Sequence, residues 1–309
     1  MPSNPPEIPD KRIFWQEIEA NKRKSVLLAV IVFVVLFALI WVMAELFSGL
    51  GSGLVTVFAF VFVALYSYVT YYHCDEIVIA ATNAKPVDAK TPEGKHLQNT
   101  VEGLAIAAGI PTPRVYVVDS PEMNAFATGR DPEHAVVAIT TGLWSKLSRQ
   151  EIEGVIGHEM SHIKNYDIRF ATLVAVMVGV VAILSEILLR YYRFGGRGNS
   201  DRKGGGYIVA IYIIGILLAI FAPFIVRFVQ SAVSRKRELL ADASAVQLTR
   251  YPEGLASALE KIGKNNKGDM PVSEAVSHLF FVDPTHSALD SFYATHPPLE
   301  ERVKLLRSM

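Results

Sequence analysis

The chain has 309 residues and carries 30 basic and 30 acidic side chains, so its formal net charge is zero. This balance argues against nucleic-acid binding, which usually requires a basic excess. Hydrophobic residues make up 51% of the chain and the mean hydropathy is +0.30, which is too apolar for an ordinary soluble domain of this length. We therefore expect part of the chain to lie in a lipid bilayer.

Four apolar blocks stand out along the chain, over residues 25–47, 54–72, 170–189 and 207–230. Each has about 20 residues or more, enough for a helix to cross a hydrocarbon core of about 30 Å. The blocks predict a transmembrane hairpin over 25–72 and a second over 170–230, giving four transmembrane helices. For the later pair, very apolar core helices buried in protein are an alternative, because Glu186 and Arg227 lie within these blocks.

Basic residues predict the orientation of this arrangement. Lys22, Arg23 and Lys24 precede the first block, whereas the turn over 48–53 contains no basic residue. The positive-inside rule then places the N-terminal segment 1–24 in the cytoplasm, and with it the catalytic parts 73–169 and 231–309. The Gly-rich loop 190–206 is also basic. If the second hairpin spans the membrane, this loop lies outside the cell, which the positive-inside rule disfavours. Either the second hairpin spans regardless, which we favour, or it is partly buried in protein or in the interface.

The segment after the first hairpin predicts a small α+β domain. A helix is expected over Glu93–Gly109, followed by short strands over Arg114–Asp119, Asn124–Gly129 and Ala135–Thr140. The stretch Ser148-Arg-Gln-Glu151 then resembles a capping box that opens another helix. Helices grouped around a short sheet are typical of α+β folds.

The stretch Gly157-His-Glu-Met-Ser-His162 raises the question of a metal site. Residues four apart share one face of a helix, so His158 and His162 can aim their imidazoles at one ion. Glu159 is placed to take a proton from an attacking water. Two incidental histidines on a surface helix are the alternative for this stretch alone, and a catalytic zinc site also needs a third protein ligand.

A candidate third ligand follows the last apolar block. Glu238 and Asp242 are also four apart, in a run rich in helix formers that continues to Thr249. One carboxylate can bind zinc, and the other can accept a hydrogen bond from a ligand histidine. An ordinary charged amphipathic helix is the alternative.

Taken together, four motifs resemble the HtpX family of membrane zinc metalloproteases, relatives of the CAAX prenyl endopeptidases. The motifs are N-A-F-A-T-G from Asn124, G-H-E-M-S-H-I-K-N-Y-D from Gly157, S-R-K-R-E-L-L-A-D from Ser234 and T-H-P-P-L-E-E-R ending at Arg302. The resemblance covers nearly the whole chain. It implies one Zn²⁺ held by His158, His162 and Glu238, with Glu159 as general base and Asp242 orienting a ligand histidine. His296 either contributes to the site or only precedes a helix opened by Pro297.

The resemblance implies a mostly α membrane protein with a small α+β zincin-like cytosolic catalytic domain. Its expected activity is peptide-bond hydrolysis at the cytosolic face of a prokaryotic cytoplasmic (inner) membrane. Expected substrates are unfolded or misfolded segments of membrane proteins, as in quality control and the stress response. If the helix of His162 continues to Phe170, the site lies about 12 Å from the membrane.

Two further questions stay open at the level of sequence. The residues Asn124, Ala125, Phe126 and Ala127 are expected either to bind an extended substrate through backbone hydrogen bonds or to form a plain core strand. Two other functional classes also remain. One is a membrane scaffold or holdase without zinc, and the other is a zinc hydrolase of lipids or prenylated peptides.

Overall fold

The structure is a computed structural model that describes residues 53–190, 235–270, 274–282 and 297–309. It also describes residues 272 and 284 and scattered positions within 19–42 and 213–221. His296, most of segment 1–24 and the loop residues after Arg190 lie outside the described residues.

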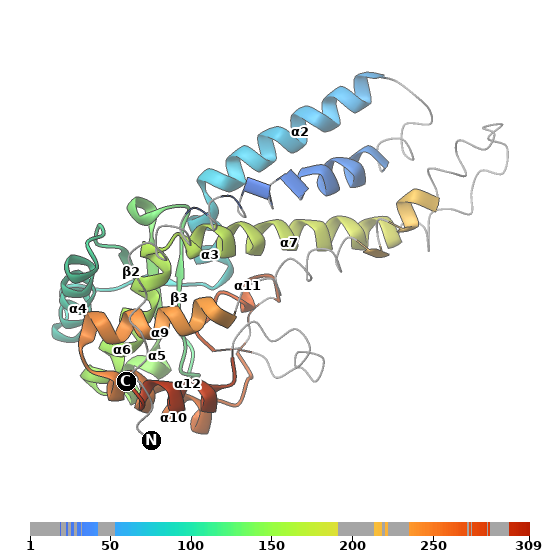
Figure 1. The fold of residues 1–309 in the computed structure, drawn as a ribbon. Coiled ribbons are helices and arrows are strands. Elements are labelled where there is room, and N and C mark those ends of the chain that lie inside the picture. The colour runs from blue at the N-terminus through green and yellow to red at the C-terminus, as the bar shows by residue number, and fades with distance from the viewer. Residues whose placement is uncertain are drawn as a thin grey trace.

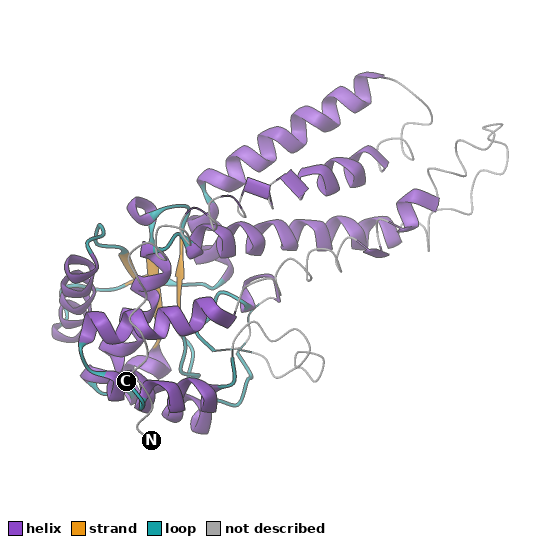
Figure 2. Ribbon diagram, in the orientation of Figure 1, coloured by secondary structure: helices purple, strands orange, loops and turns teal. Residues whose placement is uncertain are grey.

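A four-stranded sheet forms the centre of the α+β part (Figure 2). Its strands are β1 (Lys85–Pro86), β2 (Arg114–Val118), β3 (Ala125–Thr128) and β4 (Val136–Thr140), in the spatial order β1-β2-β4-β3. Strands β2 and β4 pair in parallel. Strand β1 pairs antiparallel with β2, and β3 pairs antiparallel with β4. The three predicted strands are confirmed, and the two-residue β1 is too short for an alternating pattern to reveal it.

Helices surround this sheet (Figure 1). They are α3 (Cys74–Ala81), α4 (Pro92–Ala108), α5 (Thr141–Lys146), α6 (Arg149–Lys164), α9 (Arg235–Thr249), α10 (Pro252–Asn265), α11 (Glu274–Ser277) and α12 (Leu299–Leu306), with a 3₁₀ turn over Pro132–His134. Helix α6 packs against β3, α4, α9 and α10, so it is the central helix of the domain. Its apolar face, formed by Val155, Ile156, Met160 and Ile163, is fully buried.

Local signals set the ends of these helices. The backbone N–H of Ser148 donates to Glu151 Oε2 at 2.7 Å, and the Glu151 N–H donates to Ser148 Oγ at 3.5 Å, which is the predicted capping box. Helix α4 begins after Thr91, whose hydroxyl accepts the Gly94 N–H. It ends at Gly109, which takes the left-handed conformation at φ 70°.

Two long helices extend from the α+β part in the same general direction (Figure 1). They are α2 (Gly53–Tyr72) and α7 (Asp167–Arg190), and they match the second and third apolar blocks. The described residues of the first and fourth blocks, including 33–42 and 213–217, are also helical. Within the described part of the chain, no helix has the length and hydropathy required to span a membrane.

The single cysteine is part of a core cluster. Cys74 is fully buried beside Val78 and Phe126. Burial, reinforced by the neighbouring Asp75 charge, raises the pKa of the Cys74 thiol to about 12. The thiol is therefore protonated at neutral pH, as expected of a cysteine that only packs.

Candidate metal centre

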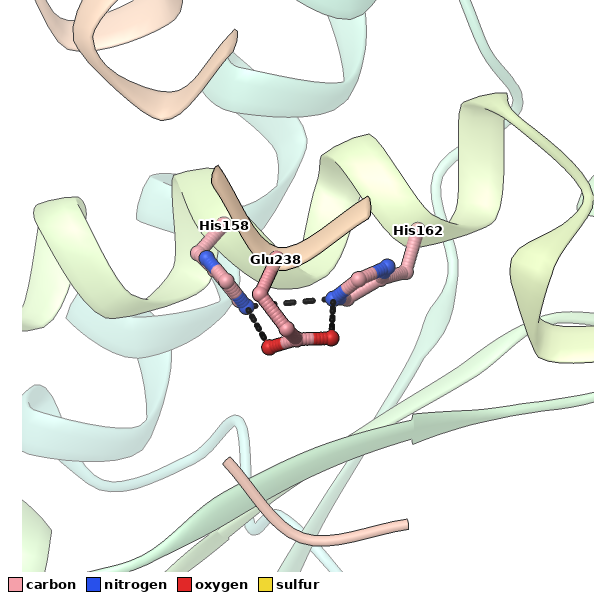
Figure 3. A group of neighbouring side chains, drawn as sticks. All are labelled: His158, His162 and Glu238. Carbon is pink, nitrogen blue, oxygen red and sulfur yellow. Dashed lines mark hydrogen bonds and ion pairs between the residues drawn. The ribbon is translucent and has the colours of Figure 1, made fainter. Parts of the chain in front are cut away.

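Three side chains converge between α6 and α9 (Figure 3). His158 Nε2 lies 3.1 Å from His162 Nε2 and 3.6 Å from Glu238 Oε2, and His162 Nε2 lies 3.7 Å from Glu238 Oε1. Zinc bonds of about 2.0 to 2.2 Å in a tetrahedron separate ligand atoms by about 3.3 to 3.6 Å. The two imidazole nitrogens and the Glu238 carboxylate are thus spaced close to this range, and two histidines with one glutamate are a ligand set of catalytic zinc sites.

Helix packing creates this convergence. His158 and His162 lie one turn apart on α6, and Glu238 lies in the first turn of α9. At Gly157 the two helices pack closely, because an added Cβ would lie 3.3 Å from Thr249 Cγ2 and 3.5 Å from the Ala245 Cα. His158, Glu159 and Glu238 each expose at most 2% of their surface, so the polar cluster is within the core.

A buried carboxylate and an arginine hold His158. Its Nδ1 lies 2.9 Å from Asp242 Oδ1, and Arg302 donates to both oxygens of Asp242, from Nη2 at 2.7 Å and Nε at 2.9 Å. Burial by itself raises the pKa of Asp242, but the charge of Arg302 and the His158 contact outweigh it and lower that pKa. Asp242 is therefore an ionised acceptor that fixes the Nδ1–H tautomer of His158.

A second carboxylate and arginine hold His162. Its Nδ1 lies 2.9 Å from Asp167 Oδ2, and Arg237 Nη1 lies 3.6 Å from Asp167 Oδ1. Both Asp167 and Arg237 are buried. The two histidines thus have the same arrangement, in which an aspartate contacts Nδ1 and an arginine contacts the aspartate.

These contacts leave the two Nε2 atoms facing each other. If each Nδ1 donates to its aspartate, each Nε2 of a neutral ring carries a lone pair, and two lone pairs at 3.1 Å repel. A cation or a proton between them removes this repulsion. Burial by itself lowers the pKa of His158, but the hydrogen bonds that its ring donates to Asp242 and Glu238 raise this pKa overall to about 9. The site therefore favours a positive charge between the two rings.

The cluster borders a small cavity of about 40 Å³. Glu159 lines this cavity together with the three candidate ligands, so its carboxylate is next to the space where a nucleophile and a scissile bond would meet. A volume of this size holds water but not a peptide.

The predicted substrate strand lies beside this cavity. Strand β3 is at the sheet edge, yet all four of its residues are buried. The segment 279–282 lies along that edge. The Phe281 N–H donates to the Ala125 carbonyl at 2.8 Å, and Phe126 and Phe280 form an antiparallel bridge. The Asn124 side chain donates from Nδ2 to the Val282 carbonyl and accepts the Val282 N–H at Oδ1. Ala127 alone of the four predicted residues lines the cavity.

The structure brings together His158, Glu159, His162, Glu238 and Asp242 as the sequence predicts, whereas His296 lies outside the described residues. Sequence reasoning missed Asp167, Arg237, Arg302 and the cavity wall over 278–281. All three missed side chains are inside the four motifs: Asp167 ends G-H-E-M-S-H-I-K-N-Y-D, Arg302 ends T-H-P-P-L-E-E-R, and Arg237 directly precedes Glu238 in S-R-K-R-E-L-L-A-D. A polar residue at the end of a motif that holds the ligands was the signal available.

Comparison with known proteins places the whole chain among proteases. A protease HtpX homolog of Dictyoglomus thermophilum is 42% identical over 296 residues, which cover 96% of this chain and 95% of the relative. A homolog of Thermoanaerobacter pseudethanolicus is 45% identical over 251 residues, 81% of this chain and 83% of the relative. A homolog of Listeria monocytogenes is 40% identical over 306 residues, covering 96% of this chain and all of the relative.

A solved structure supports the fold. The crystal structure of S. mikatae Ste24p superposes with a TM-score of 0.50 at 20% identity, and the match covers 94% of this chain and 66% of the Ste24p chain. The model of peptidase family M48 matches residues 92–309, a range that contains the sheet strands β2 to β4, α6, α9 and every residue of the candidate metal centre. The chain therefore belongs to peptidase family M48 and is a metalloprotease.

Proposed function

We propose that this metalloprotease is a zinc-dependent endopeptidase held at the cytosolic face of a prokaryotic cytoplasmic membrane. One observation carries the proposal: the ligand atoms of His158, His162 and Glu238 converge at zinc-like spacing beside the buried carboxylate of Glu159. The donor set supports zinc over harder cations, because magnesium and calcium prefer oxygen ligands.

Each residue around the cluster has a separate role in the proposed hydrolysis. Bound zinc would polarise the scissile carbonyl and activate a water. Glu159 accepts the proton of the attacking water and passes it to the leaving amine nitrogen. Asp242 keeps the Nε2 of His158 directed at the cluster through its 2.9 Å contact with Nδ1.

Strand β3 is the proposed binding edge for an extended substrate. Its edge already pairs with 279–282, so its backbone groups can accept an antiparallel partner. A substrate that binds by β-strand addition would replace this segment and reach the cavity at Ala127. Main-chain pairing of this kind gives loose sequence specificity, which suits unfolded substrates.

The membrane location rests on the four apolar blocks and on the likeness to the protease HtpX homologs, which extends across the blocks. The N-terminal basic residues support a cytosolic active site. Proposed substrates are peptide segments of misfolded membrane proteins that reach the cytosolic surface, which makes quality control under stress the proposed role.

Glu159→Gln tests the catalytic assignment. Because the amide cannot act as a base, the variant should lose casein hydrolysis by a factor of about 10² to 10⁴ while keeping one zinc per chain. Casein turnover and metal content are measured on protein purified in detergent. Glu153→Gln, a partly exposed position on the same helix that does not line the cavity, is the matched control and should match the wild type.

Glu238→Ala tests the ligand assignment. Removing a zinc ligand should lower both zinc content and casein turnover. A wild type that holds no zinc, or a Glu159→Gln variant that cleaves casein as fast as the wild type, contradicts the proposal. Activity on lipid or prenylated peptide without casein cleavage would instead support a different hydrolase.

A further inference from the structure

The first residue of α7 is part of the candidate metal centre. Asp167 Oδ2 is 2.9 Å from His162 Nδ1, and Asp167 lines the same cavity as the three candidate ligands. Asp167 exposes only 5% of its surface, so this contact is shielded from competing water. It matches the contact between Asp242 and His158, although Asp242 comes from the ligand helix α9 and Asp167 from a different helix.

A break in the helix makes the contact possible. The helix of His162 does not continue to Phe170: α6 ends at Lys164, and Tyr166 adopts a left-handed conformation at φ 60°. In an uninterrupted helix, a residue five positions after His162 would lie about 140° around the axis and face away from it. The turn at Asn165 and Tyr166 instead directs Asp167 back toward the imidazole. A tyrosine at positive φ is uncommon and indicates that this turn is fixed by its surroundings.

A third helix holds the other oxygen of Asp167. Arg237, from α9, places Nη1 3.6 Å from Asp167 Oδ1 and its guanidinium 5.6 Å from the centre of the Phe170 ring on α7. Arg237 is adjacent in sequence to Glu238, so the same turn of α9 supplies a candidate ligand and the cation that faces Asp167. Asp167 therefore connects α6, α7 and α9 at one point beside the cluster.

We propose that Asp167, supported by Arg237, is the positioning residue for His162. By accepting the Nδ1–H it fixes the ring so that Nε2 points at the metal, and it makes the first turn of α7 a structural part of the metal centre. This inference rests on the proposed function, because it assumes that the cluster binds zinc. Carboxylates that contact the free N–H of a ligand histidine typically change metal affinity about 10- to 100-fold.

The test compares Asp167→Ala and Asp167→Asn in full-length protein. Zinc affinity is measured by competition with a chromogenic chelator, and ligand geometry by the visible absorption of the Co²⁺-loaded protein. Asp167→Ala should weaken zinc binding about 10- to 100-fold and change the Co²⁺ spectrum. Asp167→Asn keeps an oxygen acceptor and should lose less zinc affinity than Asp167→Ala. At saturating zinc, kcat for casein should fall more than KM changes, because the substrate-binding edge is left intact.

Asp75→Asn is the matched control. Asp75 is also a buried aspartate in the first turn of a helix, α3, and it also pairs with an arginine, Arg114, but it does not line the cavity. Loss of the Asp75 charge in Asp75→Asn should lower the stability of the protein without changing its zinc affinity or its Co²⁺ spectrum. A general loss of helix packing would affect both positions alike.

The outcomes separate this inference from the function on which it rests. If the wild type binds zinc and cleaves casein while Asp167→Ala shows the same zinc affinity and Co²⁺ spectrum, the positioning role is wrong and the proposed function stands. A shift in Asp75→Asn equal to that in Asp167→Ala also overturns the positioning role. If the wild type binds no zinc, the proposed function is wrong and this inference fails with it.

Discussion

At the scale of single residues, the candidate metal centre balances its charges in pairs. Asp242 faces Arg302, and Asp167 faces Arg237. Because each of these pairs is neutral overall, the carboxylates of Glu238 and Glu159 remain to compensate a divalent cation. This charge balance is what the proposed function requires, with the aspartates orienting the histidines and the glutamates facing the cation and the substrate.

Loss of Arg302 should strongly destabilise the protein. It is fully buried, and its charge keeps Asp242 ionised within the core. Arg302→Met leaves that carboxylate buried without its cation, which typically costs about 3 to 5 kcal/mol. Chemical unfolding in detergent, in a Glu159→Gln background that prevents self-cleavage, measures this loss.

Arg307→Met is the control for Arg302→Met. Arg307 is on the same C-terminal segment and also bonds two carboxylates, Glu253 and Glu260, but its side chain is 44% exposed. Solvent screens such pairs, so little change in stability is expected. Equal losses in the two variants would show that burial of the Arg302 pair has no special importance.

The residues of the site differ in how far the sequence could predict them. His158, His162 and Glu238 follow from spacing on helices and from motif resemblance, because ligands one turn apart converge wherever a helix forms. Asp167 was missed because its contact depends on the helix break at Asn165 and Tyr166, and although Asn165 after a basic last turn favours a helix end, it does not show where the next helix points. Arg302 and Arg237 are two of many basic residues, and only the tertiary structure shows which of them are buried.

At the scale of elements, α6 and α10 cross without side chains between them. A Cβ on Gly154 would lie 2.7 Å from the Leu255 backbone nitrogen, and a Cβ on Gly254 would lie 2.7 Å from the Gln150 carbonyl oxygen. Because backbone atoms form this contact on both sides, neither helix can adjust by rotating a side chain. The crossing fixes α6, and with it both histidines, against α10.

Gly154→Ala should therefore destabilise the protein, although alanine favours a helix more than glycine does. Overpacking of this kind costs about 1 to 3 kcal/mol. Gly103→Ala is the control, because Gly103 is exposed on α4 and a Cβ added there would meet no atom within 4 Å, so it should be stabilising by up to about 1 kcal/mol. Thermal unfolding of both variants checks this. A Gly154→Ala variant as stable as the wild type would mean that α10 can move away freely.

The sequence predicts the elements better than their arrangement. Helix α4 and strands β2 and β4 follow from periodicity and from capping residues such as Gly109. The parallel pairing of β2 with β4, which places β3 at the edge, depends on contacts across the chain that local patterns do not contain. The pairing of 279–282 with β3 is similarly long-range, and it makes β3 both an edge strand and a buried one.

At the scale of the whole molecule, two distant stretches of the chain form the catalytic unit. Helices α4 and α6 come from before α7, and α9, α10 and α12 come from after it, yet they pack together around α6 and α9. Helix α7 extends away from this unit (Figure 1), and its first residue, Asp167, lines the cavity of the candidate metal centre. If α7 enters a membrane, as its apolar sequence predicts, the site is held at the surface of that membrane.

Cysteine labelling in cells tests this orientation. The wild-type thiol gives a low background, because Cys74 is buried and its pKa is raised to about 12. Lys95→Cys, exposed on α4, should be protected from an impermeant maleimide in intact cells and become labelled after permeabilisation. Ser52→Cys, in the turn between the first two blocks, should react in intact cells. Labelling of Lys95→Cys from outside would reverse the proposed topology.

The division of the metal ligands between α6 and α9 has a consequence for biosynthesis. Glu238 follows His162 by about 75 residues, which at about 5 to 20 residues per second take about 4 to 15 seconds to translate. During that interval the nascent chain carries His158, Glu159 and His162 but lacks Glu238, the third candidate ligand. The candidate metal centre of a newly made chain is therefore complete only once the last part of the domain has folded back onto the first.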